Sequence, residues 1–221
     1  MRMPCIGLRT IAFMLTAGLL AGCSLGKFKP SGDAQKDIRE AYQKLNSAYP
    51  YRLTENYRLT ASPVGDGGTK GQSSTRVVEF AAADRIHSRM VDSEGLTLFE
   101  GITFGDKSYM KKGDKWSELS QSEGPLKESM EKKEKMISSF LKDVQLSGTE
   151  TMNGVSCSAY AARVEGDMGG QAFTGSSKIW VGNPDGLLHQ TDSNTKMANY
   201  ASRSQVVYEY NVDIKIEQPV P

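Results

Sequence analysis

The sequence has few of the residues on which catalysis and metal binding depend. Among 221 residues there are two histidines, His87 and His189, and three cysteines. No Gly-x-Ser-x-Gly nucleophile elbow occurs, and the histidine, cysteine and carboxylate residues are not clustered at metal-ligand spacing. Both histidines fall on the polar side of predicted strands, beside Arg89 and Thr191, so we expect them at the surface. The sequence therefore predicts a protein that is not an enzyme and that needs no cofactor or metal ion.

An excess of charge of one sign is also lacking. Lysine and arginine number 27 against 26 aspartate and glutamate residues, and the loss of Arg2 and Arg9 with a leader peptide would leave 25 against 26. Such a chain gains little from counterion release or from attraction to anionic headgroups. We therefore expect no nucleic-acid partner, and electrostatic attraction is not the main force that would hold the chain at a membrane.

The first residues have the pattern of an export signal. Arg2 and Arg9 precede the apolar run 11–20, which is too short to span a bilayer stably. The motif Leu-Ala-Gly-Cys follows at residues 20–23 and ends at Cys23. This ending resembles the lipobox of bacterial lipoproteins, which implies cleavage after residue 22 and acylation of Cys23. An ordinary signal peptide with an incidental cysteine is the alternative. Residues 23–30 would then form a lipidated tether to the membrane. Ser24 after the cysteine favours the outer membrane, facing the periplasm, if the host is Gram-negative.

The cysteine count leaves no intramolecular disulfide. Cys5 leaves with the leader and Cys23 carries lipid, so Cys157 is the one thiol of the mature chain. It alternates with Val155 and Ala159 on the apolar side of a predicted strand, and we expect it to be buried. A redox or metal-binding role for this thiol is the alternative.

Hydrophobic periodicity predicts two amphipathic helices and about ten or eleven antiparallel strands. The helices are expected over residues 31–49 and 124–142, where apolar residues recur at intervals of three and four. The strands are expected at residues 51–59, 75–83, 85–91, 96–104, 107–111, 115–119, 146–152, 155–164, 171–181, 187–192 and 206–216. Because a twisted sheet this wide tends to curl, we predict an α+β, β-dominated single domain over residues 31–221, an incomplete β-barrel with helices on its concave face.

Three short motifs indicate a known superfamily. They are the hairpin 109–116, which runs from a tyrosine to a tryptophan; the strand 154–160, Gly-Val-Ser-Cys-Ser-Ala-Tyr; and the hairpin 178–187, which begins Lys-Ile-Trp-Val. In type and order they resemble the lipoprotein-carrier superfamily of half-barrels, the LolA/LolB and LppX/LprG-like proteins. The chain departs from that pattern at Leu188, where relatives often have proline.

The resemblance implies an apolar cavity, under a helical lid, that binds lipid or acyl chains and carries or transfers them. The candidate cavity residues are Leu98, Ile102, Phe104, Met130, Ile137, Phe140, Tyr208, Tyr210 and Val212. The expected partners are the membrane, through acylated Cys23, a lipid or acyl-chain ligand, and a possible envelope protein. The alternative is a scaffold or protein-interaction lipoprotein whose core is filled by side chains.

Overall fold

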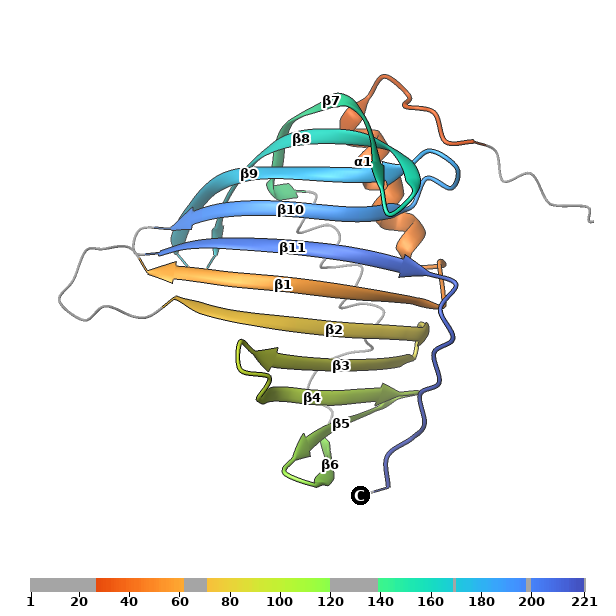
Figure 1. Ribbon diagram of the computed structural model, residues 1–221, viewed down its shortest axis with the longest axis vertical. Helices are drawn as coiled ribbons and strands as arrows, with labels where there is room; N and C mark the ends of the chain where they lie inside the picture. Colours follow the sequence, from red (N-terminus) through yellow and green to blue (C-terminus); the bar gives the residue numbers. More distant parts are fainter. Residues whose placement is uncertain (1–26, 62–70, 120–138, 169, 198–199, 221) are drawn as a thin grey trace, which may run out of the picture.

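One curved antiparallel sheet organises the part of the chain that the structure describes. The structure is a computed structural model, and it describes residues 27–61, 71–119, 139–168, 170–197 and 200–220. In chain order the elements are α1 (Ala34–Leu45), β1 (Tyr51–Ala61), β2 (Gln72–Ala82), β3 (Arg85–Asp92), β4 (Thr97–Phe104), β5 (Lys107–Lys112), β6 (Lys115–Leu119), β7 (Leu141–Met152), β8 (Val155–Met168), β9 (Gln171–Gly182), β10 (Leu188–Met197) and β11 (Tyr200–Tyr210) (Figure 1).

The sheet consists of two meanders joined at the middle. The strand order is β6-β5-β4-β3-β2-β1-β11-β10-β9-β8-β7, so neighbours in the sequence are neighbours in space except at the joint between β1 and β11. We call β1–β6 the first half and β7–β11 the second half. At the joint, Tyr51 lies opposite Tyr210 and Ala61 opposite Tyr200. The outermost strands β6 and β7 are not paired with each other, which makes the sheet an incomplete barrel and confirms the predicted fold class.

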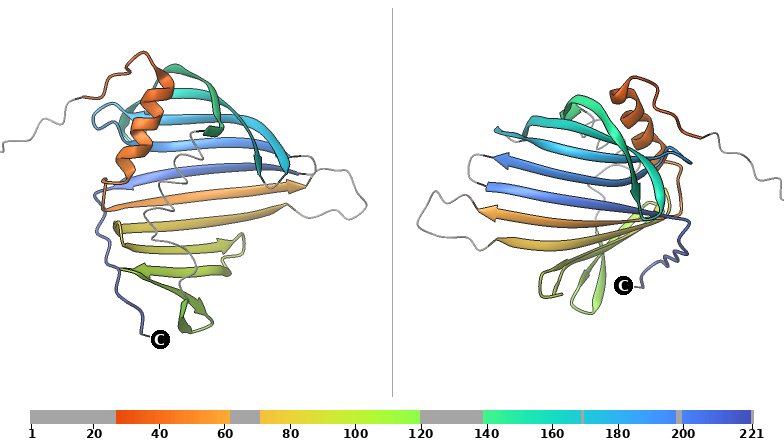
Figure 2. Two further views of the ribbon diagram at one scale, coloured as in Figure 1. Left: turned by 180° about the vertical axis from the view of Figure 1, so that it is seen from behind. Right: turned by 45° about the horizontal axis from the view of Figure 1, so that its top comes forward.

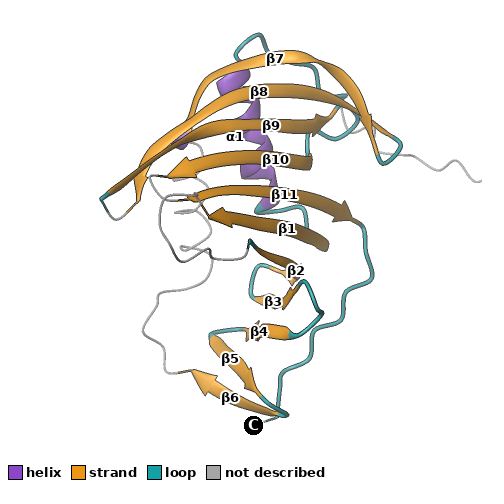
Figure 3. Ribbon diagram, turned by 60° about the vertical axis from the view of Figure 1, so that its left-hand side comes forward, coloured by secondary structure: helices purple, strands orange, loops and turns teal. Residues whose placement is uncertain are grey.

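Helix α1 packs on one face of the second half. Asp33 caps the helix by accepting a hydrogen bond from the backbone N–H of Lys36 at 3.0 Å. Ile38 and Ala41, one turn apart, are 1% exposed and pack against side chains of β8–β10. Figures 2 and 3 show the sheet curving around this helix. We call the face that carries α1 the inner face and the opposite face the outer face.

Turn chemistry explains why the hairpins form where the sequence predicts them. Asn153 and Gly154 connect β7 to β8 with φ values of 50° and 82°, the left-handed conformation that an Asn-Gly hairpin turn requires. Gly113, with φ of 60°, does the same between β5 and β6. These two turns fix the register of their hairpins.

The prediction for the last strand is wrong. The period-two pattern predicts a strand at 206–216, but β11 is Tyr200–Tyr210. Asn211, with φ of 57°, turns the chain out of the sheet, and its N–H donates to the carbonyl of Pro50 at 3.2 Å. Residues 212–220 continue as an extended tail along the ends of the strands (Figure 1), so their alternating burial comes from contact on one side and not from pairing.

The predicted helix 124–142 lies almost entirely outside the described residues. The prediction is wrong for the last two residues of this helix. Leu141 and Lys142 begin β7, and Leu141 pairs with Val164 of β8. Of the predicted apolar stripe, Phe140 and Leu141 pack in the core under α1. Within the described ranges, no helix is both long and apolar enough to cross a bilayer.

Candidate functional site

The inner face carries two apolar rows that cross the joint between the halves. Residues directly opposite in an antiparallel ladder share a face. One row contains Tyr210, Tyr51, Phe80 and Ile86, and the next contains Tyr208, Leu53, Val78 and Ser88. The Tyr51 ring stacks on Phe80 with centroids 4.4 Å apart and lies 6.0 Å from the Tyr210 ring. This aromatic group continues the core beyond the edge of α1.

Under α1 the inner face is tightly packed. Its buried side chains are Ile38, Ala41, Leu141, Tyr160, Ala162, Val164, Phe173, Ile179, Val181, Leu188 and Tyr208. The carboxylate of Asp37, which is 2% exposed, accepts hydrogen bonds from the Tyr160 hydroxyl at 2.9 Å and from the Ser31 N–H at 3.1 Å. Burial and the bond to Asp37 raise the pKa of Tyr160. This bond fixes the first turn of α1 to β8.

Beyond α1 the inner face of the first half remains apolar but is less buried. Met90 and Phe99 lie opposite each other on β3 and β4, and Met110 lies opposite Gly101 on β5. All three side chains are half-buried. A Cβ at Gly101 would lie 2.7 Å from the Phe99 ring, so glycine lets that ring lie across β4. These half-buried side chains continue the rows of buried Val78, Phe80 and Ile86. We define the apolar strip as Val78, Phe80, Ile86, Met90, Phe99 and Met110.

The inner face changes from apolar to polar along the strands. The row that contains Met90 also contains Arg76, directly opposite it, and Glu55, and the following row contains Ser177, Ser193 and Ser204. The hydroxyl groups of Ser177 and Ser193 lie 2.8 Å apart, and Ser204 donates to Glu55 at 2.8 Å. Arg76 donates to Ser88 at 3.2 Å. An elongated molecule on this face would therefore meet apolar groups at one end and polar groups at the other.

Buried tyrosine hydroxyls lie at the apolar end. Burial raises the pKa of Tyr42 to about 12, and it also raises the pKa of Tyr208 and of Tyr210. These hydroxyls therefore remain protonated at neutral pH. The Tyr210 hydroxyl donates to the carbonyl of Leu188 at 2.5 Å, which ties β11 to the start of β10.

The predicted cavity residues do not all share this face. Tyr208, Tyr210 and Phe140 lie on the inner face, and the Phe140 ring meets Phe173 edge to face at 4.9 Å. Val212 lies in the tail after β11. Cys23, Met130 and Ile137 lie outside the described residues.

Three predicted cavity residues of β4 lie elsewhere. Ile102 faces outward opposite His87, Phe104 lies under the guanidinium of Arg85 at 5.1 Å, and Leu98 is 53% exposed. Sequence reasoning missed Phe99 because the outward-facing positions of β4 are the more apolar ones. The register against β3 is the signal that identifies its inner face.

A chain of charged side chains crosses the outer face of the first half. Arg52 pairs with Glu79 at 2.7 Å, His87 bridges Glu79 and Glu100 at 3.2 and 3.3 Å, and Lys111 pairs with Glu100 at 3.2 Å. We call these five residues the charge ladder. Burial acts to raise the pKa of both glutamates, but hydrogen bonds from their partners outweigh it and lower both values.

The second histidine corrects the expectation of a surface position. His189 is 9% exposed, lies 3.1 Å from the carboxylate of Asp185 and meets the Tyr210 ring edge to face. Burial acts to raise the pKa of Asp185, but hydrogen bonds, the largest from His189, lower it overall. Cys157 is fully buried with Ala159 and Trp180, as predicted, and burial followed by the charge of Asp185 raises its pKa to about 11. A thiol in this state is a poor nucleophile.

The described residues contain no group of three histidine, cysteine or carboxylate side chains that is arranged to hold a metal ion. The inner face instead offers apolar contact area and hydroxyl groups. Apolar area with a few polar groups beside it is typical of surfaces that bind small molecules.

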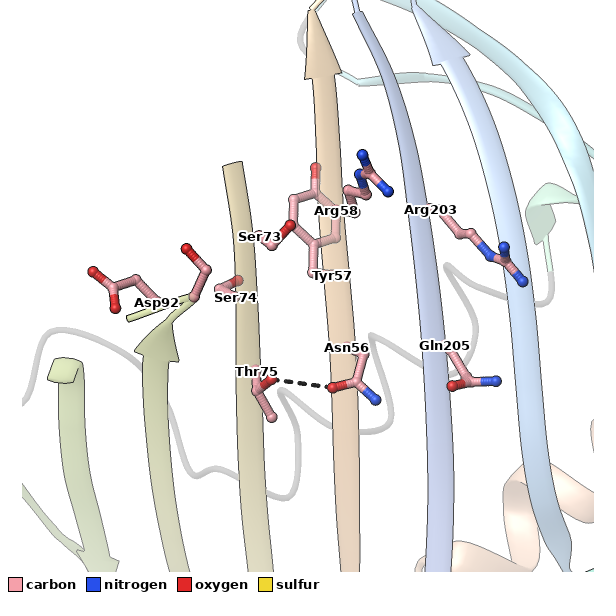
Figure 4. A pocket seen from close by; sticks show the side chains of 10 residues that line it. Asn56, Tyr57, Arg58, Ser73, Ser74, Thr75, Asp92, Arg203 and Gln205 are labelled. Carbon is pink, nitrogen blue, oxygen red and sulfur yellow. Dashed lines mark hydrogen bonds between the residues drawn. The ribbon is translucent and has the colours of Figure 1, made fainter. Parts of the chain in front are cut away.

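A polar hollow of about 240 Å³ lies on the outer face over β2, β1 and β11 (Figure 4). Its floor consists of two adjacent rows, Gln205–Asn56–Thr75 and Arg203–Arg58–Ser73. Thr75 donates to the Asn56 side-chain oxygen at 3.1 Å. The hollow contains none of the predicted cavity residues.

Comparison with known proteins gives the fold and little else. No family model matches the sequence, and no curated protein matches it. The lipoprotein LppX from Mycobacterium tuberculosis is 15% identical, with 85% of this chain and 100% of that chain covered, at a TM-score of 0.51. LprF from Mycobacterium bovis is 10% identical, with 89% and 100% covered, at 0.49, and a LolA-superfamily protein from Nitrosomonas europaea is 9% identical, with 82% and 94% covered, at 0.34. The LppX comparison carries the argument, and it confirms the predicted fold.

Proposed function

We propose that this chain, which has the fold of the lipoprotein LppX, is an exported envelope lipoprotein that binds lipid or acyl chains on the inner face of its sheet. The observation that carries the proposal is the apolar strip, which continues past α1 and borders a row of polar side chains. Binding an amphiphile there requires no catalytic group, so the proposal describes a binding protein and not an enzyme.

The energetics of the strip favour an acyl chain. Burying apolar surface contributes roughly 25 cal/mol per Å², so each 100 Å² of ligand and strip surface buried together would contribute about 2.5 kcal/mol before the costs of binding. Methionine side chains such as Met90 and Met110 adapt their shape to flexible ligands. The polar groups near Arg76 would then lie beside the head of the ligand.

Anchoring through acylated Cys23 is part of the same proposal. Phe28, half-buried, packs against the core, and the ammonium of Lys44 lies 5.8 Å from its ring centroid. Five residue steps from Cys23 to Phe28 span at most about 18 Å. A lipid on Cys23 would therefore hold the end of the domain that carries α1 close to the bilayer, on the outer membrane facing the periplasm if the host is Gram-negative.

The anchoring is tested separately from lipid binding. Mass spectrometry of the membrane fraction should find a mature chain that begins at acylated Cys23. Cys23→Ala should give an unprocessed or soluble product. An unmodified N-terminus at another position would contradict the anchoring and leave the binding proposal intact.

The binding experiment uses the full chain and a matched pair of variants. Lipid extracted from the purified protein is identified by mass spectrometry, and saturable binding of a fluorescent fatty acyl probe is measured. Phe99→Asp places a charge on the strip and should abolish probe binding. Leu98→Asp, the neighbouring exposed position, should leave it unchanged. Equal binding by both variants, each shown to be folded by circular dichroism, would contradict the inner face as the binding surface.

The second candidate function is a scaffold or protein-interaction lipoprotein with a filled core. The observation that favours it is the dense packing of Tyr51, Tyr160 and Ile179, each at most 1% exposed. In that case no lipid would be extracted, no acyl probe would bind, and Phe99→Asp would destabilise the fold. A protein partner in the envelope would then be the ligand.

A further inference from the structure

We propose that the hollow on the outer face binds the phosphate group of a polyol phosphate, an ester whose alcohol carries further hydroxyl groups. The first observation is an arginine pair. Arg58 and Arg203 lie directly opposite each other on β1 and β11, a placement that destabilises a sheet when the charges are alike. Two cations in one row of the hollow provide the charge that a phosphate requires.

The two arginines differ in how their charge is balanced. Arg203 donates to both carboxylate oxygens of Asp192, at 3.3 and 2.9 Å. Arg58 is exposed, and no carboxylate among the described residues pairs with it. The row therefore retains one unbalanced guanidinium group. A guanidinium fork forms two parallel hydrogen bonds to a phosphate, which makes an oxyanion the best-suited occupant.

The remaining floor residues suit the alcohol part of the ligand. Asn56 and Gln205 lie in the adjacent row, and Asn56 retains its NH₂ group as a donor because its oxygen already accepts from Thr75. Ser73 adds a hydroxyl group beside Arg58. Amides and hydroxyls in one row and arginines in the next match a molecule with a phosphate at one end and hydroxyl groups at the other.

The single carboxylate in the lining has a structural role in a turn. Asp92 already accepts hydrogen bonds from the backbone N–H groups of Glu94 and Leu96, each at 2.9 Å, and so stabilises the turn after β3. The hollow lies on the opposite face from the apolar strip. The inference is therefore independent of the proposed lipid binding, and either one can fail without the other.

The test is calorimetric titration of the full chain, in neutral detergent, with sn-glycerol 3-phosphate and with inorganic phosphate. Arg58→Gln should weaken binding of the ester about tenfold, because one charge-assisted bidentate contact is lost. Arg39→Gln removes an exposed arginine of α1 outside the hollow and should leave the affinity unchanged. Gln205→Ala should weaken binding of the ester more than binding of inorganic phosphate, since Gln205 lies in the row that meets the alcohol.

A second arm separates a soluble ester from a membrane lipid headgroup, which presents the same chemistry. The titration is repeated with added vesicles of phosphatidylcholine alone or with phosphatidylglycerol. If the soluble ester binds more weakly in the presence of vesicles that contain phosphatidylglycerol, but not in the presence of phosphatidylcholine vesicles, the hollow binds headgroups. If neither kind of vesicle changes the affinity, the hollow binds soluble esters. Equal affinities of the unmodified chain and Arg58→Gln, or no saturable binding up to about 10 mM, would overturn the proposal.

Discussion

The two halves of the sheet use their inner faces differently. In the second half, strands of 10 to 14 residues lie under or beside α1, and Tyr160, Ile179 and Leu188 are fully buried. In the first half, β3 to β6 have 5 to 8 residues, and Met90 and Phe99 of their inner face are half-buried. The second half therefore supplies most of the packed core, while the outer strands of the first half leave half-buried apolar side chains on the face where lipid binding is proposed.

The outer faces differ in a related way. The first half carries the charge ladder, which links β1 to β5 through two ion pairs and the side-chain contacts of His87 with Glu79 and Glu100. In the second half, Glu150 instead accepts from Lys178 and from the indole of Trp180 beside the buried Cys157. Where apolar burial is smaller, polar cross-strand contacts hold neighbouring strands together.

The largest expected effect comes from truncating matched side chains in the two halves. Leu188→Ala removes a fully buried side chain under α1 and should lower the free energy of unfolding by about 2–5 kcal/mol. Met90→Ala should lower it by roughly half as much, because that side chain is half-buried. Urea unfolding of both variants measures the difference. Equal losses would show that the first half is packed as tightly as the second.

The next effect concerns the bond that fixes α1 to the second half. Tyr160→Phe removes the hydroxyl that donates to buried Asp37 and should lower the free energy of unfolding by about 1–3 kcal/mol. Tyr57→Phe, on half-buried Tyr57 of the first half, should change it by less than about 0.5 kcal/mol. Thermal unfolding of the pair gives the comparison, and similar melting temperatures would show that the Asp37 bond is not needed to hold the helix.

The charge ladder predicts a dependence on pH that arises in the first half. The folded-state pKa values of Glu79 and Glu100 are lowered, so the stability they contribute is present above the unfolded value, near pH 4.5, and is lost as pH falls through the folded values. We expect a loss of about 1 kcal/mol between pH 5 and pH 3 from these half-buried pairs. Glu100→Gln should reduce this loss in urea unfolding measured at both pH values. A loss that does not change in the variant would place the acid sensitivity elsewhere.

The prediction with the smallest difference in free energy concerns local opening of each half, measured by the rate of thiol labelling. Cys157 should react slowly with thiol reagents in the native protein and quickly in urea, because it is buried and burial raises its pKa to about 11. Met90→Cys, in a Cys157→Ala background, should react at least tenfold faster in the native state, since its half opens more readily. The rate of labelling followed by mass spectrometry tests this, and comparable native rates would remove the difference between the halves.

The sequence predicts the strands that local chemistry determines. The Asn153-Gly154 turn, the alternation in β8 and the apolar stripe of α1 each indicate the observed element, because turn conformation and one-sided burial leave a direct periodic signal. The alternation of Tyr208 and Tyr210 likewise indicates a shared face, and both lie on the inner face. The LppX-like fold, suggested by short motifs, is confirmed.

What the sequence does not predict depends on contacts distant in the chain. The start of β11 gives no strand signal, because its residues 202–205 are polar on both faces. The pattern extends the predicted strand past its true end because the tail also alternates. The pattern of β4 indicates the wrong inner side, because Ile102 and Phe104 are apolar but face outward. The buried position of His189 is a further example. Its partner Asp185 lies four residues earlier, in the turn between β9 and β10, and the folded turn brings the two side chains together.

The joint between β1 and β11 also sets the order in which the protein can fold. Tyr51 and Tyr210 are partners although the whole of both meanders separates them in the chain. Pairings of such high sequence separation form slowly, because the entropy of closing the loop is lost before the contact stabilises anything. The two meanders can each assemble from local hairpins, but they become one sheet only after the last strand has been made. Until then the edges of β1 and β11 are unpaired, and this is the period in which the chain is most exposed to aggregation.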